Sequence, residues 1–329
     1  TGIEYAGTNL STLFAQPSRL FSLQYHRFLF DIVKFNKTAI ADLETGSINA
    51  TITLEQYLQK LSLSELFHSH YLLPMAAAIW SSDLNDVNKM PALFFIRFFK
   101  NHGLLSVTDR PQWYTLPGGS RSYIEPLTRG FKHAIELNTQ VTSVRKYADG
   151  VEITTSCGTE KFDAVVLASH SDQSLQLLDD SEKELKTLLE GIPYADNDVV
   201  LHTDRSQMPR SLRAWASWNY QIQNQPDGLG AVVTYDMNRL QNLTGPHQFF
   251  VTLNNTQNID ADSILGQWTY AHPQFGPDSL VVQSNIESVN TGSRIVVAGA
   301  WCRNGFHEDG VVSGEAAARA IQATLGLHV

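Results

Sequence analysis

Cysteine is nearly absent from this chain of 329 residues. Its two cysteines, Cys157 and Cys302, stand far apart and have no metal-ligand spacing. This excludes a disulfide framework and a cysteine-based metal site, and it makes a reducing compartment, the cytoplasm, the expected location. His68 and His70 are two residues apart with no third ligand nearby, so we expect no metal.

Long apolar runs are also missing. No stretch approaches the roughly 18 residues that a membrane-spanning helix needs, and the longest apolar clusters, at 93–99 and 165–168, are short or broken by charge. The formal net charge of -9 and the pI near 5.6 argue against nucleic acid as the main partner. The length allows a large core divided between two lobes.

The sequence contains no Gly-x-Gly-x-x-Gly, the loop that holds the pyrophosphate of a dinucleotide. The chain starts at Thr1 instead of Met, and Gly2–Gly7 reads as a strand and turn already in progress. We therefore expect a fragment whose upstream residues have been lost. A sheet without its first strand would show an unpaired edge or a gap.

The first 105 or so residues have the pattern of a helical region. Thr53-Leu-Glu-Gln56 is a capping box, which predicts a helix start there. The other apolar patterns predict helices over 17–41, 64–70, 74–80 and 91–103.

The rest of the chain is richer in strands. Asp149-Gly150 predicts a hairpin turn. Strands are predicted at 113–116, 134–137, 140–147, 151–155, 162–168, 199–203, 213–220, 231–237, 248–253, 267–270 and 294–298, with helices at 121–130, 181–191 and 310–325.

This order of elements predicts an α/β and α+β mixture with discontinuous domains. We expect a mainly helical part of a substrate domain over 1–110 and an antiparallel-sheet part over 176–290. Residues 111–175 and 291–329 are expected to form a nucleotide-binding, Rossmann-like domain that lacks its first βαβ unit.

The segment near the end of the chain is the most specific. Arg294–Trp301 reads as an apolar strand and a small-residue turn, and Gly305–Gly314 leads into a helix that starts near Gly310. Free backbone N–H groups at such a helix start suit an anionic or electron-rich ligand.

Two other segments support the same interpretation. Pro117-Gly118-Gly119-Ser120 is a turn whose glycines let the backbone approach a flat ligand, although a plain tight turn is the commoner explanation. Val141 lies in an alternating strand just after this turn and a helix.

Together these segments resemble the flavin-containing amine oxidase superfamily. The narrower resemblance is to bacterial FAD-binding, amine-oxidase-like proteins found beside cyclopropane fatty acid synthases. It is carried by stretches such as His70-Tyr-Leu-Leu-Pro74, Ala214–Tyr220, Tyr270-Ala-His272-Pro273 and Gly305–Gly310.

The resemblance implies FAD as cofactor. It places Gly118 and Gly119 near the isoalloxazine ring and the Val141 backbone at the adenine. Gly299 and Ala300 would approach the pyrophosphate and ribityl chain, and Ala300 replaces an acidic residue common in the family. His307, Asp309 and Gly310 would contact the ring, or His307–Asp309 would be a solvated helix cap. Without the glycine loop, we expect weak or no FAD binding by these 329 residues.

The resemblance also suggests the substrate pocket, which aromatic and polar side chains of the sheet would line. For any one of them a place in the core is the commoner role. His70 and His102 are expected to be hydrogen-bonded core histidines. The pocket candidates are Trp218, Asn219, Tyr220, Tyr235 and His272.

Two interpretations of function stay open. One is an FAD-dependent oxidoreductase of the amine oxidase type, with hydride transfer from a small-molecule or lipid substrate to flavin N5. The other is a non-catalytic module that binds an apolar ligand or a protein. The Phe-rich segment Leu93–Lys100 would line an acyl tunnel, touch a membrane peripherally, or be buried, and burial is favoured.

Overall fold

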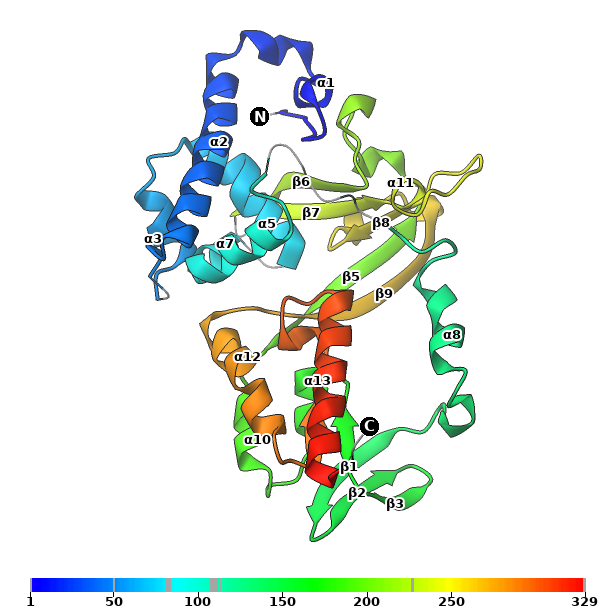
Figure 1. The fold of residues 1–329 in the computed structure, drawn as a ribbon. Coiled ribbons are helices and arrows are strands. Elements are labelled where there is room, and N and C mark those ends of the chain that lie inside the picture. The colour runs from blue at the N-terminus through cyan, green and yellow to red at the C-terminus, as the bar shows by residue number, and fades with distance from the viewer. Residues whose placement is uncertain are drawn as a thin grey trace. The chain divides into compact units, whose positions relative to one another are not determined.

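The computed structural model describes residues 2–49, 51–80, 84–106, 112, 114–225 and 228–327. The chain forms two compact units, each built from two separate stretches. The first unit is Thr1–Arg129 with Asp196–His272, and the second is Gly130–Ala195 with Pro273–Val329. The result is a mixed α/β fold with an antiparallel sheet, as predicted (Figure 1).

Helices dominate the start of the first unit, as expected. Ser22 caps the long helix by accepting a hydrogen bond from Tyr25 N, and Thr53 and Gln56 form the predicted capping box. The predicted helices at 64–70 and 74–80 are one continuous run that contains a π-helical turn. The elements are α1 (Leu10–Leu13), η1 (Pro17–Phe21), α2 (Leu23–Glu44), α3 (Leu54–Gln59), α4 (Glu65–Phe67), the π-helix η2 (His68–Leu72), α5 (Leu73–Trp80), α6 (Leu84–Lys89), α7 (Ala92–Asn101), η3 (Ser120–Tyr123) and α8 (Ile124–Thr128).

The Phe-rich segment is buried, as favoured. Phe94, Phe95, Phe98 and Phe99 of α7 all lie in the interior, packed around Trp80. Aromatic packing of this kind stabilises the helical core. The suggestion that this segment touches a membrane is therefore wrong.

A five-stranded antiparallel sheet completes the first unit, in the order β6-β7-β8-β5-β9. Its register pairs Trp218 with Tyr235 and Val199 with Leu253. The predicted strand at 213–220 begins only at Trp218, because 212–214 form a 3-10 turn. The bounds are β5 (Tyr194–His202), η5 (Arg205–Gln207), η6 (Leu212–Ala214), β6 (Trp218–Gln225), β7 (Gly228–Asp236), α11 (Met237–Gln241), β8 (Phe250–Leu253), η7 (Thr256–Asn258), η8 (Ala261–Ser263) and β9 (Ile264–Pro273).

The second unit holds the predicted meander β1-β2-β3 and a parallel pair, β4 with β10. Val165 pairs with Ile295 and Leu167 with Val297. Among the described residues this parallel sheet has only these two strands, so each leaves one edge unpaired, as expected. The elements are η4 (Lys132–Ala134), β1 (Val141–Tyr147), β2 (Gly150–Thr155), β3 (Gly158–Phe162), β4 (Val165–Leu167), α9 (Ser171–Leu177), α10 (Lys183–Leu189), α12 (Pro277–Asn290), β10 (Ile295–Val297), η9 (Ala300–Cys302) and α13 (His307–Leu325).

Several predicted boundaries in the chain are wrong. No strand forms at 134–137 or at 114–116, whereas Trp113 lies outside the described residues. The strand at 162–168 is two strands, since Phe162 ends β3 and Val165 starts β4. The last helix starts at His307, three residues early, because Asp309 caps it. Helix α12 was not predicted.

Candidate functional site

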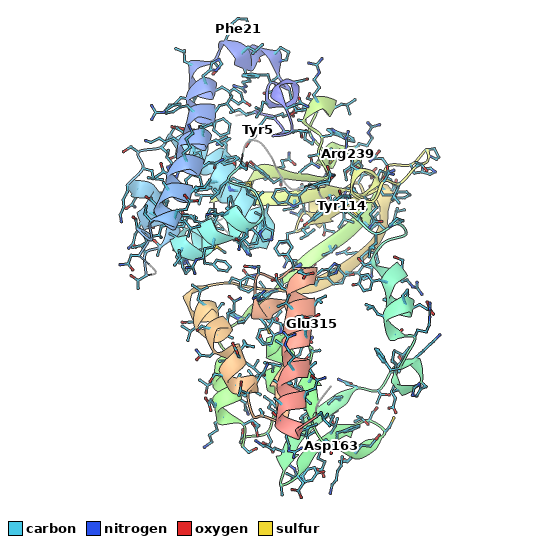
Figure 2. All side chains as sticks on the ribbon, in the orientation of Figure 1. Tyr5, Phe21, Tyr114, Asp163, Arg239 and Glu315 are labelled. Atoms are coloured by element: carbon cyan, nitrogen blue, oxygen red, sulfur yellow. The ribbon has the colours of Figure 1, made fainter. Side chains whose placement is uncertain are left out.

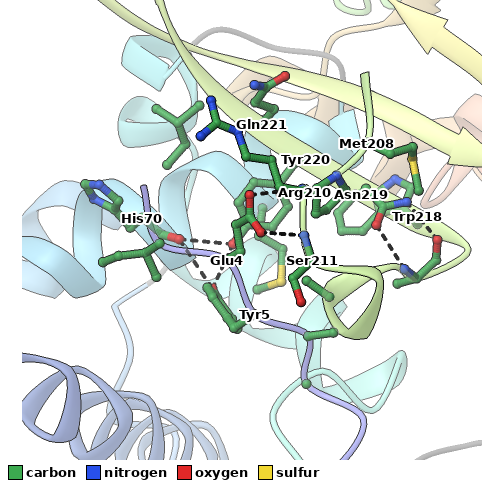
Figure 3. Close-up of a pocket in the computed structure, with 18 of the residues that line it drawn as sticks. Glu4, Tyr5, His70, Met208, Arg210, Ser211, Trp218, Asn219, Tyr220 and Gln221 are labelled. Atoms are coloured by element: carbon green, nitrogen blue, oxygen red, sulfur yellow. Dashed lines mark hydrogen bonds between the residues drawn. The ribbon is translucent and has the colours of Figure 1, made fainter. Parts of the chain in front are cut away.

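The first unit contains a cavity of about 1180 Å³ (Figure 3). Its wall combines the N-terminal segment Gly2–Thr8, the helical run around His70, the segment Ser206–Ser211 and strand β6. Every lining residue belongs to the first unit. The apolar lining residues include Ile3, Ala6, Met75, Leu104, Met208, Ala214, Trp218 and Ile222.

Two tyrosine hydroxyls meet in the cavity wall. Tyr5 Oη and Tyr220 Oη lie 2.9 Å apart, and both approach the carbonyl oxygen of His70, at 3.3 and 3.0 Å (Figure 3). Burial raises the pKa of Tyr5 well above its usual value, and burial likewise raises the pKa of Tyr220. Both hydroxyls therefore stay neutral at physiological pH and serve as hydrogen-bonding groups, not as bases.

The acceptor in this cluster belongs to the π-helical turn η2. Such turns interrupt the regular helical hydrogen bonds and often lie at functional sites. The His70 ring lies outside the tyrosine pair, with Nδ1 2.8 Å from Ser69 Oγ. Burial lowers the pKa of His70, so the ring is neutral at pH 7. The ring is hydrogen-bonded as expected, but it is half-buried and lines the cavity, so the prediction that it belongs to the core is wrong.

Glu4 fixes the N-terminal segment against the other side of the cavity. Its carboxylate accepts hydrogen bonds from Arg210 N at 3.1 Å and Ser211 N at 2.9 Å (Figure 3). Its own backbone N–H donates to Gln16 Oε1 at 3.3 Å. This charged anchor aligns Tyr5 with strand β6.

Three of the predicted pocket residues line this cavity: Trp218, Asn219 and Tyr220. Asn219 is buried. Its Oδ1 accepts a hydrogen bond from Ala216 N at 2.9 Å, and its Nδ2 donates to Ala216 O at 2.7 Å and to Thr234 O at 3.2 Å. These bonds hold the turn before β6 in shape. The rings of Trp218 and Tyr220 meet edge to face, with centroids 6.0 Å apart.

The other two predicted pocket residues do not line it. Tyr235 pairs with Trp218 across β6 and β7. His272 lies near the end of β9, where its Nδ1 is 2.9 Å from Asn197 Nδ2. Asn197 Oδ1 in turn accepts from Asn254 Nδ2 at 2.7 Å, so the imidazole is oriented by a chain of amides.

Gly118 and Gly119 form the expected turn in the first unit. Their φ angles of 82° and 80° are left-handed, which favours glycine, and Gly119 N donates to Leu116 O at 2.9 Å. No atom lies within 4 Å of a Cβ added at either position. The space beside the backbone of this turn is therefore free of other described atoms.

The remaining predicted cofactor residues lie in the second unit. Val141 is the first residue of β1, paired with Thr155. Gly299 follows β10, and a Cβ there would overlap the indole of Trp301, whose Nε1 donates to Ser169 O at 3.1 Å. The Gly299 N–H donates to Ser313 Oγ at 3.0 Å.

The start of α13 is capped by the side chain of Asp309, a residue of the helix itself. Asp309 is buried, and one of its carboxylate oxygens accepts from Phe306 N at 3.0 Å, which supports the helix-cap interpretation for this residue. His307 is exposed, whereas Ala300 and Gly310 are half-buried beside the turn. Among the described residues, no group of three or more His, Cys, Asp or Glu could hold a metal ion.

Sequence reasoning missed Tyr5 and Glu4. The only local signal was their position in a short apolar segment, and their partners Tyr220 and Ser211 are more than 200 residues away. The role of the His70 carbonyl depends on the π-turn, which has no recognisable pattern in the sequence.

One family model matches the chain. The model of the flavin containing amine oxidoreductase family matches residues 15–228. No curated protein sequence matches the chain.

Solved structures of an isomerase and of two amine oxidases have similar folds. A fatty acid isomerase from P. acnes that produces CLA is 13% identical with a TM-score of 0.62, over 94% of this chain and 77% of the isomerase. Cyclohexylamine oxidase from Brevibacterium oxydans IH-35A is 14% identical with a TM-score of 0.58, over 97% of this chain and 77% of the oxidase. A putrescine oxidase double mutant is 10% identical with a TM-score of 0.59, over 91% and 75%. At these identities the likeness concerns the fold.

Proposed function

Because the chain belongs to the flavin-containing amine oxidoreductase family, we propose that it acts as an FAD-dependent oxidoreductase on an apolar substrate. The observation that carries the proposal is the cavity of about 1180 Å³, large enough for a small organic molecule or an acyl chain. Its wall is mostly apolar, with the neutral Tyr5 and Tyr220 hydroxyls as orienting groups.

A lipid or acyl substrate is our preferred class. The cavity lining offers methionines, aromatic rings and aliphatic side chains, which suit a hydrocarbon better than a polar metabolite. One structure of similar fold is a fatty acid isomerase, whereas two others are amine oxidases. We further propose kinship with the amine-oxidase-like flavoproteins that accompany cyclopropane fatty acid synthases.

We propose that the second unit forms part of an FAD site. The close approach of Gly299 to Trp301 keeps the turn after β10 compact, and the 19-residue helix α13 directs its positive dipole end toward this side. We propose that Gly299, Ala300 and the start of α13, together with the Val141 backbone, hold the part of the cofactor that this unit binds. A flavin held there would supply the hydride acceptor, its N5 atom.

Binding by these 329 residues alone should be weak. The sequence contains no Gly-x-Gly-x-x-Gly, and the Gly299 N–H is already bonded to Ser313 Oγ. The purified chain is therefore expected to carry little flavin, which is measured by the fluorescence of the supernatant after heat denaturation. A stoichiometric flavin content would contradict this part of the proposal.

The experiment for the activity uses the chain with excess FAD, without oxygen. Alkylamines, unsaturated fatty acids and cyclopropane fatty acids are added in turn, and bleaching of the flavin absorbance is followed. We expect bleaching by an acyl substrate and a slower rate in Tyr220→Phe. Bleaching by amines alone would overturn the substrate class.

A non-catalytic module is the second candidate. It is favoured by one observation: the cavity is lined by the first unit alone. If fatty acids quench the tryptophan fluorescence of the chain less in Trp218→Phe than in the unaltered protein, but no compound bleaches the flavin, the module is the better description.

A further inference from the structure

The start of α2 carries large apolar side chains that the first unit leaves in solvent. Phe21 is 90% exposed, Leu23 87% and Phe30 62%, and Leu20 is also exposed. Figure 2 shows Phe21 at the outer end of this helical region. Arg27 and Lys37 are exposed on the same helix. We name Leu20, Phe21, Leu23, Arg27, Phe30 and Lys37 the apolar-basic face.

Leu23, Arg27, Phe30 and Lys37 lie on one side of α2, whereas Leu20 and Phe21 belong to η1, which ends directly before the N-cap of α2. Leu23, Phe30 and Lys37 are seven residues apart, which places them on one stripe of an α-helix. The opposite side is already packed into the unit, with Tyr25, Phe28 and Phe35 buried. The apolar-basic face therefore contributes nothing to the core, and a cluster of exposed large apolar residues marks an interaction site.

Its charge differs from that of the whole chain. Between residues 17 and 41 there are four cations, Arg19, Arg27, Lys34 and Lys37. The single carboxylate of this stretch, Asp31, is buried and accepts hydrogen bonds from Arg27 Nε at 3.0 Å and Ser64 N at 2.9 Å. The chain as a whole has a formal net charge of -9. Arg27 also donates to Ser62 O at 3.4 Å and Lys34 Nζ donates to Leu61 O at 2.7 Å, whereas Lys37 is exposed. The exposed apolar surface is thus surrounded by more positive than negative charge on an acidic protein, which fits an anionic partner.

We propose that the apolar-basic face docks the protein onto a bilayer that contains anionic phospholipid. Phe21, Leu23 and Phe30 enter the boundary between headgroups and acyl chains, while Arg27 and Lys37 lie at the level of the phosphates. The contact is peripheral, since no helix among the described residues is long and apolar enough to cross a membrane. The proposal does not depend on flavin chemistry or on the cavity.

Docking would nevertheless bring the cavity close to lipid. Gln16, which lines the cavity, directly precedes η1, and Phe21 is the last residue of η1. An apolar ligand leaving the bilayer near this face would then have a short path to the cavity wall.

The test is co-sedimentation of the purified chain with vesicles. Vesicles of phosphatidylglycerol and phosphatidylcholine are compared with vesicles of phosphatidylcholine alone. We expect binding to the anionic vesicles only, with weaker binding as the salt concentration rises. In Phe21→Ser/Leu23→Ser the partition coefficient should fall by at least about tenfold, from the loss of two inserted side chains. Lys37→Gln should lower it by about fivefold, the effect of one cation at the surface.

The matched control replaces two exposed apolar residues elsewhere on the chain. Leu265 is 56% exposed on β9 and Val281 62% on α12. Leu265→Ser/Val281→Ser should bind vesicles as the unaltered chain does. Three results would overturn the proposal: a fall of the partition coefficient in this control as large as in Phe21→Ser/Leu23→Ser, no vesicle binding by the unaltered chain, or equal binding to anionic and neutral vesicles. The proposal would also be overturned if Phe21→Ser/Leu23→Ser changed the oligomeric state and left vesicle binding unaltered, because the apolar-basic face would then be covered by a second copy of the chain.

Discussion

The hydroxyls of Tyr5 and Tyr220 lie 2.9 Å apart although the two residues are separated by 215 positions in the sequence. Both reach the His70 carbonyl, which belongs to a π-helical turn. Three distant segments thus meet at one polar point in a largely apolar cavity wall. This point joins the N-terminal segment, the helical region and the sheet of the first unit.

The energetic link between the two tyrosines can be measured by a double-mutant cycle. Tyr5→Phe and Tyr220→Phe should each lower the free energy of unfolding by about 0.5–1.5 kcal/mol, the net value of a hydrogen bond. Together they should cost less than the sum of the single changes, because they share one contact. Urea unfolding provides the measurement.

Tyr270→Phe is the control for this cycle. Tyr270 is exposed on β9, so loss of its hydroxyl should change stability by less than about 0.5 kcal/mol. Strict additivity of Tyr5→Phe and Tyr220→Phe would show that the two hydroxyls do not interact in solution.

Gly299 should tolerate no side chain. Its φ of 162° is extended and open to any residue, so the constraint is space: an added Cβ would overlap the Trp301 indole. Gly299→Ala should lower the free energy of unfolding by about 1–3 kcal/mol, as overpacking of a core does. The indole would lose its hydrogen bond to Ser169 O, visible as a change in tryptophan fluorescence.

The same substitution at Gly314 is the matched control. No atom lies within 4 Å of a Cβ at Gly314, which is inside α13. Gly314→Ala should therefore raise stability by about 0.5–1 kcal/mol through helix propensity. If both alanine variants behaved alike, the close packing of Gly299 on Trp301 would be refuted.

Local patterns in the sequence predicted local structure well. The capping box at Thr53 formed because its two hydrogen bonds join residues three positions apart. The hairpin at Asp149-Gly150 also formed, but Gly150 is already the first residue of β2, paired with Tyr147. A Cβ at Gly150 would overlap the Phe162 carbonyl of β3, a constraint that depends on the third strand.

Features that depend on distant contacts were not predictable. Helix α12 was an exception: it has a proline at its first position, and Val282, Ile286 and Val289 recur at i, i+4 and i+7 and pack on the core of the second unit, so its pattern was present in the sequence but was overlooked. The cavity required Glu4 to reach Arg210 and Ser211. Trp218 and Tyr220 were found because aromatic residues in a strand are visible in the sequence, whereas the hydrogen-bond partner of Tyr220 was not.

The amide chain that orients His272 makes a prediction about its tautomer. Asp198 N donates to Asn254 Oδ1, and Asn254 Nδ2 donates to Asn197 Oδ1. Asn197 Nδ2 must then donate to His272 Nδ1, so the ring proton belongs on Nε2. Long-range ¹H–¹⁵N spectra of the imidazole should show the Nε2–H form.

Replacement of Asn197 tests the same series of hydrogen bonds. Asn197 is buried, and Asn197→Leu would leave the Asn254 amide without its acceptor, so unfolding should become easier by about 1–3 kcal/mol. The His272 signal should change while that of the exposed His307 stays the same. An Nδ1–H tautomer in the unaltered protein would contradict the orientation.

A fully buried histidine predicts how stability depends on pH. His202 has no solvent exposure; its Nδ1 accepts from Asp204 N at 3.1 Å, and its Nε2 lies 2.7 Å from Thr252 Oγ1. Burial lowers the pKa of His202 below the ordinary 6.5. Below pH 6.5 the unfolded chain therefore binds a proton that the folded chain does not, so the free energy of unfolding falls as the pH falls.

Urea unfolding between pH 7 and pH 5 measures this effect, in a range above the titration of ordinary carboxylates. His202→Gln cannot titrate, so the loss of stability toward pH 5 should be smaller than in the unaltered chain. It should not vanish, because burial also lowers the pKa of His68 and His70. An equally steep loss in His202→Gln would mean that His202 takes up its proton as readily in the folded protein as in the unfolded chain.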